Sequence, residues 1–475
     1  MTALSGMPRS SAPALLRRAT AALGAVLVLL LCVDAGVSAG TDGFGVGTLL
    51  RIAVLLGGLL AVVCLSRFEY FVLGVLVVRP ALDITKTGGG GSVLASAVAA
   101  AIVLGAVLWL AAQVYAGTLR RVSLLSRVLI VLLAVMTLSA LLASDPVRSA
   151  LQVARLAAAV AVLLVVEQLA VDRAARWRVL TACYASAVLP LLVGVQQQLT
   201  GSFLKQSSGL GRITGTFVHP NAFGFYLVLL LTMGAAVFRH LDGRTKLLVG
   251  AVLVLGTVEL VLSYSRGSWI SIIVGVLVVG ALQARKLLVL LPVALGALVL
   301  AVPSVLLRLS DLTQEETVNG TPGNSFMWRI THWQVVLRGA RGHELLGLGP
   351  GSSDFLGDEV LPPHNDFVRM YVETGVVGTA LYLAFILAAL ATAFGMMRAG
   401  HRRGLERGIA VGAIACTAAF VVGSIGGNLI SEVVVLLYLF AFLGLASGTA
   451  LQCPAPQPPR TPGPALAPAG AGGPA

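Results

Sequence analysis

The chain has 475 residues, of which 57% are hydrophobic and 11% carry a formal charge. A soluble enzyme of this size needs far more polar surface, and a disordered chain is rich in charge, so the composition excludes both. The formal net charge of +13 would indicate nucleic-acid binding in a soluble protein, whereas in a membrane protein such an excess usually orients the helices.

Apolar runs long enough to cross a bilayer follow one another along most of the chain. A span needs about 20 mostly apolar residues. We therefore expect an all-α, polytopic integral membrane bundle of about 12–14 transmembrane helices. The expected spans are 19–39, 47–66, 68–79, 92–116, 124–143, 149–170, 179–199, 220–238, 247–263, 267–283, 287–306, 375–397, 408–427 and 430–450.

Lysine and arginine gather at the N-terminus and in alternate loops between these runs. Cytoplasmic loops of membrane proteins are enriched in both residues. We therefore expect a multi-pass protein of the cell (cytoplasmic) membrane with both termini cytoplasmic. The basic residues of these segments are Arg9, Arg17, Arg18, Arg67, Arg120, Arg121, Arg127, Arg173, Arg176, Arg178, Arg239, Arg244, Lys246, Arg285, Lys286, Arg398, Arg402, Arg403 and Arg407.

This topology divides the chain into five parts. We expect a cytoplasmic N-terminal segment over residues 1–18 and transmembrane helices 1–11 over residues 19–306. Residues 307–374 are predicted to form a long periplasmic or extracellular catalytic loop with short helices, and residues 375–450 helices 12–14. The Pro-, Ala- and Gly-rich residues 451–475 predict a disordered cytoplasmic tail.

The first polar cluster extends from Arg212 to Asn221 and reads R-I-T-G-T-F-V-H-P-N. Pro220 suits the first position of a helix, and Asn221 suits its first turn. This pattern is compatible with an ordinary helix start. A helix N-terminus also offers free N–H groups and a partial positive charge to an anion, and Arg212 adds a full charge.

The second cluster, Ser263 to Ser268, lies at the expected outer start of another span and contains Arg266. An arginine at a helix end can simply extend to the lipid headgroups. Arg266 lies between two strongly apolar runs, however, and ionisable residues in such places are usually functional.

The third cluster lies in the long loop. Trp328, Arg329 and Trp333 fall on a predicted amphipathic helix, and the turn-rich G-L-G-P-G follows at 347–351. A lone histidine is more often structural, but His364 lies beside a membrane helix on its polar side, where a neutral imidazole can act as a base near pH 7. Asn365, Asp366 and Glu373 follow it before the next span.

Motifs for nucleotide or metal chemistry were not found in the sequence. There is no P-loop, no H-E-x-x-H and no Asp-x-Asp pair. We therefore expect no ATP use, no metal ligands and no cofactor.

Taken together, the motifs resemble those of the O-antigen ligase and polymerase family, whose members handle lipid-linked glycans. The similarity is best over about 205–380, and five motifs occur in the family's order. One departure is Glu344, because the family usually has a proline before the Leu-Leu-Gly run. The matching segments are Thr216 to Asn221, Ser265 to Gly267, Arg329 with Trp333, Leu345 to Gly351, and His364-Asn365 followed by Glu373 to Gly375.

The resemblance implies a membrane glycosyltransferase that moves a glycan from undecaprenyl diphosphate to a sugar hydroxyl of an acceptor glycan or glycolipid. It implies that His364 is the base and that Arg212 and Arg266 bind the diphosphate, with Arg266 counted among the catalytic residues. Membrane lipid is an expected partner and nucleic acid is not. Further candidates are His219, Asn221 and Arg329 for the donor, and Asn365, Asp366 and Glu373 for the acceptor or for positioning the loop.

The chemistry of such a donor agrees with these residues. A diphosphate leaves as a stable anion and needs no general acid, so the remaining task is to remove a proton from the acceptor hydroxyl. Arginine forks match the diphosphate oxygens, and attack opposite the leaving group predicts metal-independent transfer with inversion.

Two questions stay open at this point. A ligase and a polymerase share this donor chemistry and differ in the acceptor. A transporter or flippase of a lipid-linked or small anionic substrate also explains many spans and arginines, although transporters tend to place charges near the bilayer midplane rather than at span ends.

Overall fold

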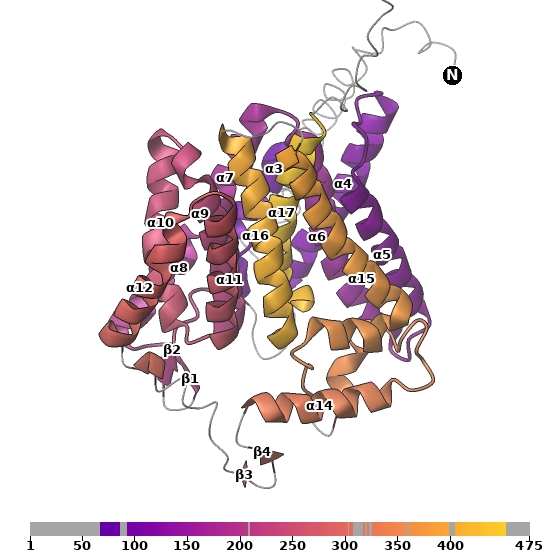
Figure 1. The fold of residues 1–475 in the computed structure, drawn as a ribbon. Coiled ribbons are helices and arrows are strands. Elements are labelled where there is room, and N and C mark those ends of the chain that lie inside the picture. Colours follow the sequence, from indigo (N-terminus) through magenta and orange to yellow (C-terminus); the bar gives the residue numbers. More distant parts are fainter. Residues whose placement is uncertain are drawn as a thin grey trace, which may run out of the picture.

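The computed structural model describes residues 67–85, 93–207, 210–302, 304–306, 317–318, 321–322, 325–357, 360–398 and 404–452. The expected spans 19–39 and 47–66, the N-terminal segment 1–18 and nearly all of the tail lie outside these residues. Helices dominate the described part (Figure 1), as the apolar runs predict. They are α3 (Phe68–Val78), α4 (Val93–Tyr115), α5 (Leu124–Leu141), α6 (Pro146–Leu169), α7 (Arg173–Ala185), α8 (Val188–Thr200), α9 (Pro220–Val237), α10 (Gly243–Leu262), α11 (Arg266–Leu282), α12 (Lys286–Ala301), α14 (Ser325–Gly339), α15 (Asp366–Arg398), α16 (Gly404–Gly426) and α17 (Val433–Ala450).

Short elements join these helices. In the described segments, the strands form two antiparallel hairpins, in which β1 pairs with β2 and β3 with β4. Four single 3-10 turns complete the set. The strands are β1 (Lys205–Ser207), β2 (Leu210–Arg212), β3 (Thr317–Val318) and β4 (Thr321–Pro322), and the 3-10 turns are η1 (Ala81–Thr85), η2 (Phe238–His240), η3 (Ser352–Phe355) and η4 (Leu429–Ser431).

Nine helical runs within the described residues are long and apolar enough to cross a membrane, and α3, α11 and α12 are shorter apolar helices. The protein is therefore an all-α, multi-pass membrane protein, as the hydropathy pattern predicts. With 11 residues, α3 extends about 16 Å, which is well short of the ~30 Å hydrocarbon core. The run predicted over 179–199 begins earlier and consists of two helices, α7 and α8, that are separated at Ser186 and Ala187.

The centre of the bundle is formed by α17, α9 and α16. Their most apolar windows are 89%, 83% and 78% buried inside the protein, against 17% for α4. Helices that are apolar on all sides and buried form a core. Gly448 lets α17 approach α6 closely, because a Cβ there would lie 2.2 Å from the carbonyl oxygen of Glu167.

The helices α14 and η3 and the short hairpins lie together at one end of the bundle, which we call the α14 end (Figure 1). Helices α9, α11 and α15 begin at this end, and α16 finishes there. The described parts of the predicted long loop, 307–374, therefore lie over the start of three spans. The division of the chain into five parts, including its cytoplasmic and outer segments, stays a prediction.

Helix α15 bends sharply near its start. Gly375 has φ 65° and ψ −165°, so two helices meet there. The amide groups of Val376 and Val377 donate to the carbonyl oxygens of Glu344 and Leu345, at 2.8 and 3.4 Å. The bend thus separates the first turns of α15, at the α14 end, from the longer membrane-spanning part.

Candidate functional site

His364 lies in the loop that enters α15, and α14 holds that loop in place. The indole Nε1 of Trp333 donates to the carbonyl oxygen of Pro363 at 2.5 Å. On the same helix, Nε2 of His332 lies 3.2 Å from the carbonyl oxygen of Leu361. The predicted helix carrying Trp333 therefore exists and serves as a support for the segment that presents His364.

The backbone of His364 is left-handed, with φ 51°. Such a conformation costs a non-glycine residue about 1–3 kcal/mol and is concentrated at functional sites. Within the described residues, the other non-glycine positions with positive φ are Phe203 and Tyr264, and Tyr264 lies two residues before Arg266. Strained backbone thus accompanies both residues expected to be catalytic.

Asn365 and Asp366 anchor the same segment. The Oδ1 atom of Asn365 accepts from the amides of Phe367 and Val368, at 2.9 and 3.2 Å, and so caps the start of α15. The fully buried Asp366 accepts through Oδ2 from the Ser424 hydroxyl at 2.7 Å and the Ile430 amide at 3.2 Å. Both side chains therefore form hydrogen bonds inside the protein at the start of α15.

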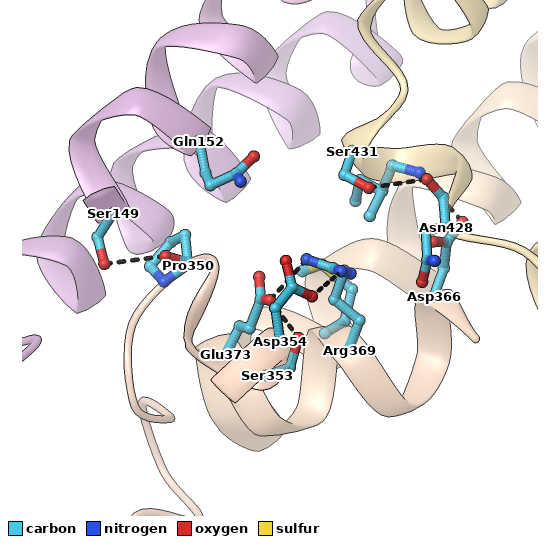
Figure 2. A network of polar contacts seen from close by, with 12 residues as sticks. Ser149, Gln152, Pro350, Ser353, Asp354, Asp366, Arg369, Glu373, Asn428 and Ser431 are labelled. Carbon is cyan, nitrogen blue, oxygen red and sulfur yellow. Dashed lines mark hydrogen bonds and ion pairs between the residues drawn. The ribbon is translucent and has the colours of Figure 1, made fainter. Parts of the chain in front are cut away.

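Glu373 lies in a buried ionic network (Figure 2). Its Oε1 accepts from Nη1 of Arg369 at 2.8 Å and from the Ser353 hydroxyl at 2.6 Å. Arg369 forms a second ion pair with Asp354. Arg369 was not among the residues predicted from the sequence, although its spacing of four residues from Glu373 places both on one helix face.

The glycine turns at 347–351 fit against the bend of α15. Gly347 and Gly349 have φ values of 69° and 101°, and a Cβ on Gly347 would lie 2.3 Å from the carbonyl carbon of Glu373. The Gly349 amide donates to the carbonyl oxygen of Glu373 at 3.0 Å. Only glycine tolerates both the conformation and the close approach, so this motif shapes the loop.

The Arg212 cluster joins three elements at the α14 end. The Nε atom of Arg212 donates to the carbonyl oxygen of Ser263, and Nη2 donates to Oδ1 of Asn221, both at 2.8 Å. His219 is the N-cap of α9, and its Nδ1 accepts from the amide of Asn221 at 3.1 Å. As predicted, Pro220 is the first residue of the helix. The guanidinium is therefore held at the start of α9.

Arg266 is the first residue of α11, and this end of α11 packs against α9 and α16. A Cβ on Gly267 would lie 3.2 Å from the ring of Phe225, and one on Gly423 or Gly427 would lie 2.6 or 3.3 Å from it. The Phe225 ring thus brings the start of α11 together with the end of α16.

Arg329 links α14 to the end of α16. Its Nη1 donates to the carbonyl oxygen of Gly426 at 2.9 Å. Burial lowers the pKa of Arg329 from its usual value, but a guanidinium stays protonated at any physiological pH. Arg329 was predicted to bind the donor, and in the structure it anchors the end of α16 at Gly426.

The imidazole of His364 meets the side chain of Asn428, with 3.0 Å between Nδ1 and Nδ2. The pKa of His364 is lowered to about 3, first by burial and then by its electrostatic interactions with Arg329, His219, Arg369 and His332. His364 is therefore neutral at physiological pH. Nothing in the local sequence around Asn428 pointed to this contact.

His219 is also neutral. Burial, followed by the charges of Lys205 and Arg212, lowers its pKa to about 4. Because His219 is among the groups that lower the pKa of His364, the first and third sequence clusters share one electrostatic environment. Helix α11, which begins with Arg266, packs against α9.

Metal-binding geometry is not found in this region. Among the residues that the structure describes, no group of three or more His, Cys, Asp or Glu side chains could hold a metal ion. Arg212, Arg266 and Arg329 bring positive charge to the α14 end, and arginine side chains suit an anion.

Residues 251–383 match the family model described as O-antigen ligase. The chain carries an O-antigen ligase domain. The resemblance inferred from the motifs is therefore confirmed over this region, and it supports a membrane glycan ligase or polymerase that acts on lipid-linked glycans. A search of curated proteins gave no match.

The O-antigen ligase match extends from α10 to the first half of α15. It contains Arg266, Arg329 and His364, together with Glu373. Arg212 precedes it and Asn428 follows it, so the folded chain brings residues from outside the matched region to the same end of the bundle.

Proposed function

We propose that this protein transfers a glycan from undecaprenyl diphosphate to a sugar hydroxyl of an acceptor glycan or glycolipid. One observation carries the proposal. The half-buried imidazole of His364 is neutral, with a pKa of about 3, and lies among the positive charges of Arg329 and Arg369 at the α14 end. A neutral imidazole can accept a proton, and fixed arginines can bind a diphosphate.

In the proposed reaction, His364 accepts the proton of the acceptor hydroxyl through Nε2. The hydroxyl oxygen attacks the anomeric carbon, and the bond from that carbon to the diphosphate oxygen breaks. The electron pair leaves with the diphosphate, which is a stable anion. Attack on the face opposite the leaving group inverts the anomeric carbon, and no metal ion is needed in this scheme.

Donor binding is proposed at the meeting point of α9 and α11. Arg266 begins α11, and Arg212 is held at the start of α9 by Asn221. Helix starts offer unpaired N–H groups and a partial positive charge to phosphate oxygens. His219, which shares this helix start, completes the donor side, and Arg329 contributes its positive charge. Charge that develops on the diphosphate as the bond breaks is then stabilised by groups already in place.

The acceptor side is proposed to lie along the entry to α15. Asn365 and Asp366 set the direction of this segment through their bonds to Phe367 and Ile430. Glu373 holds the adjoining loop through Ser353. These residues act by positioning His364 rather than by touching the reacting atoms.

The α14 end is proposed to face outward from the cytoplasmic membrane. The opposite end carries basic side chains in three successive connections, at Arg239 to Lys246, at Arg285 and Lys286, and at Arg398 and Arg407. Positive charge marks the cytoplasmic side of a membrane protein, so both termini are proposed to be cytoplasmic. This orientation brings the site to lipid-linked glycans that have already crossed the membrane.

The direct test is product formation by purified protein supplied with an undecaprenyl-diphosphate-linked glycan and an acceptor. We expect Arg266→Ala to reduce transfer by at least about 10²-fold, the usual loss when one group that stabilises developing charge is removed. The matched control is Arg244→Ala, because Arg244 is exposed and lies in the first turn of α10 at the opposite end. Full transfer by a well-folded Arg266→Ala protein would contradict the diphosphate site.

The product of the same assay separates the two enzyme types. A ladder of increasing length indicates a polymerase, and a single transfer to a different acceptor indicates a ligase. Reconstituted vesicles test the transporter or flippase: movement of the lipid-linked glycan across the bilayer without any product would favour that function.

A further inference from the structure

Within the described part of the chain, the side chain of Asn428 makes one hydrogen bond, and its partner is the proposed base. Nδ2 of Asn428 and Nδ1 of His364 are 3.0 Å apart. The other end of the amide, Oδ1, is buried without a hydrogen-bond partner in the described residues. The amide can therefore rotate by half a turn without losing any bond except the one to His364, and it can pair with either tautomer of the imidazole.

The two amide orientations have opposite consequences for catalysis. If Nδ2 donates to Nδ1 of His364, the proton of the neutral ring is on Nε2, and that nitrogen cannot act as a base. If Oδ1 instead accepts from Nδ1–H, the lone pair of Nε2 is free. The second orientation also suits the imidazolium that forms after proton transfer, because both ring nitrogens are then donors.

Several contacts hold Asn428 in place. On one side, Arg329 bonds the carbonyl oxygen of Gly426 at 2.9 Å. On the other, Asp366 accepts from the amide of Ile430 at 3.2 Å, and the Ser431 hydroxyl donates to the carbonyl oxygen of Asn428 at 2.8 Å. The residues two before and two after Asn428 are therefore tied to α14 and to α15.

The same two helices hold His364. Trp333 of α14 bonds the carbonyl oxygen of Pro363, the residue before it, and Asp366 lies two residues after it. His364 and Asn428 are separated by 64 positions in the chain but share their supports. Because the imidazole of His364 and the amide of Asn428 are both held in place, they lose little conformational freedom when they pair. A catalytic group needs such support to keep its orientation.

We propose that Asn428 is a positioning residue for His364: its Oδ1 accepts the hydrogen bond from Nδ1–H, selects the tautomer with a free Nε2, and stabilises the imidazolium after proton transfer. This proposal depends on the proposed function, because it presumes that His364 is the base. Asn428 itself does not touch the substrate. A neutral amide fits this position because it pairs with the imidazole without adding a negative charge beside an anionic donor.

The test compares Asn428→Leu and Asn428→Asp by the pH dependence of kcat in purified protein with lipid-linked donor. Leucine has a similar volume but cannot accept a hydrogen bond, and we expect it to lower kcat about 10- to 100-fold, part of the ~10²- to ~10⁴-fold that general-base catalysis contributes. Aspartate accepts from Nδ1–H and favours the imidazolium. It should keep kcat within roughly 10-fold of the unchanged protein and move the acidic limb of the profile to higher pH.

If Asn428 only held the backbone in place, its replacement would not shift the acidic limb of the kcat profile. The groups that face His364 are Arg329 and His332 of α14, His219 of α9 and Arg369 of α15, and none of them differs between the two variants. Ser431→Ala is the control for local loosening, since it removes a bond to the Asn428 backbone and leaves the amide. Its acidic limb should coincide with that of the unchanged protein, and a shift equal to that of Asn428→Asp would overturn the proposal.

Two further results would also overturn it. One is an Asn428→Leu protein with unchanged kcat, and the other is an Asn428→Asp protein whose acidic limb does not move. A His364→Ala protein measured beside them separates the two levels of the account. If His364→Ala keeps full kcat, the base assignment in the proposed function fails as well. If it loses activity while both Asn428 variants behave like the unchanged protein, only the role of Asn428 fails.

Discussion

Arg329 donates a hydrogen bond of 2.9 Å to the carbonyl oxygen of Gly426, and this bond joins the long loop to the end of a membrane helix. The same guanidinium is the largest charged contributor to the low pKa of His364. One side chain therefore both anchors the segment beside the candidate site and adds to the positive electrostatic potential there.

Replacing Arg329 should raise the pKa of His364, since a positive charge that opposes the imidazolium is removed. With the pKa near 3, labelling of His364 by diethyl pyrocarbonate, which modifies neutral imidazole, should stay constant down to about pH 5. In Arg329→Met the labelling should begin to fall at higher pH. Mass spectrometry of the labelled peptide measures this without an activity assay. Arg338→Met, at the far end of α14, should leave the pH dependence of labelling unchanged.

The donor should change the pKa of the base. Burial, followed by the neighbouring cations, lowers the pKa of His364 to about 3 in the free protein, so kcat/KM should show no acidic limb from this residue between about pH 5 and about pH 8. A bound diphosphate offsets the cations and raises the pKa in the complex. The acidic limb of kcat should therefore lie at higher pH than that of kcat/KM, and coincident limbs would contradict the account.

The bend in α15 should depend on Gly375. Its φ of 65° costs a residue with a side chain about 1–3 kcal/mol, and a Cβ would lie 2.3 Å from the carbonyl carbon of Leu345. Gly375→Ala should therefore lower thermal stability in detergent and loosen the loop. Gly395→Ala in the same helix is the control, because nothing lies within 4 Å of its Cβ position, and it should gain up to about 1 kcal/mol. Equal melting temperatures for the two variants would show that the bend is not constrained.

The ionic network of Arg369 should matter more for folding than for chemistry. Arg369→Met leaves the buried carboxylate of Glu373 without its cation, and removing one member of a buried pair costs about 3–5 kcal/mol. The double variant Arg369→Met, Glu373→Gln should recover part of that loss, because it removes the uncompensated charge. Thermal unfolding of the single and double variants checks this. A double variant no more stable than Arg369→Met alone would contradict the pairing.

The sequence was sufficient for the broad architecture and for part of the site. Uniform apolar runs predicted α5, α9, α16 and α17, and Pro220 marked the start of α9 because its ring suits the first helical position. The separation between α7 and α8 was missed, since Ser186 and Ala187 do not interrupt an apolar run. A hydropathy profile averages over a window of residues, so a helix break at two small residues does not appear in it.

The contacts between distant segments could not be predicted. Asn428 lies 64 positions from His364, and an asparagine after two glycines is typical of an ordinary turn. Arg369 was overlooked because the apolar run after Gly375 dominates its surroundings. Asp366 and Glu373 were proposed for the acceptor or the loop, and only the folded chain shows that Ser424 and Arg369 already occupy them.

The central claim is that His364 removes the proton from the acceptor hydroxyl. It is tested most directly by single-turnover transfer from a purified undecaprenyl-diphosphate-linked glycan, with His364→Ala compared against His343→Ala, a change of an exposed histidine in the same loop. The account predicts a loss of about 10²- to 10⁴-fold in the transfer rate for His364→Ala, the usual contribution of a general base, and an unchanged rate for His343→Ala. Transfer by His364→Ala at the rate of the unchanged protein would contradict it.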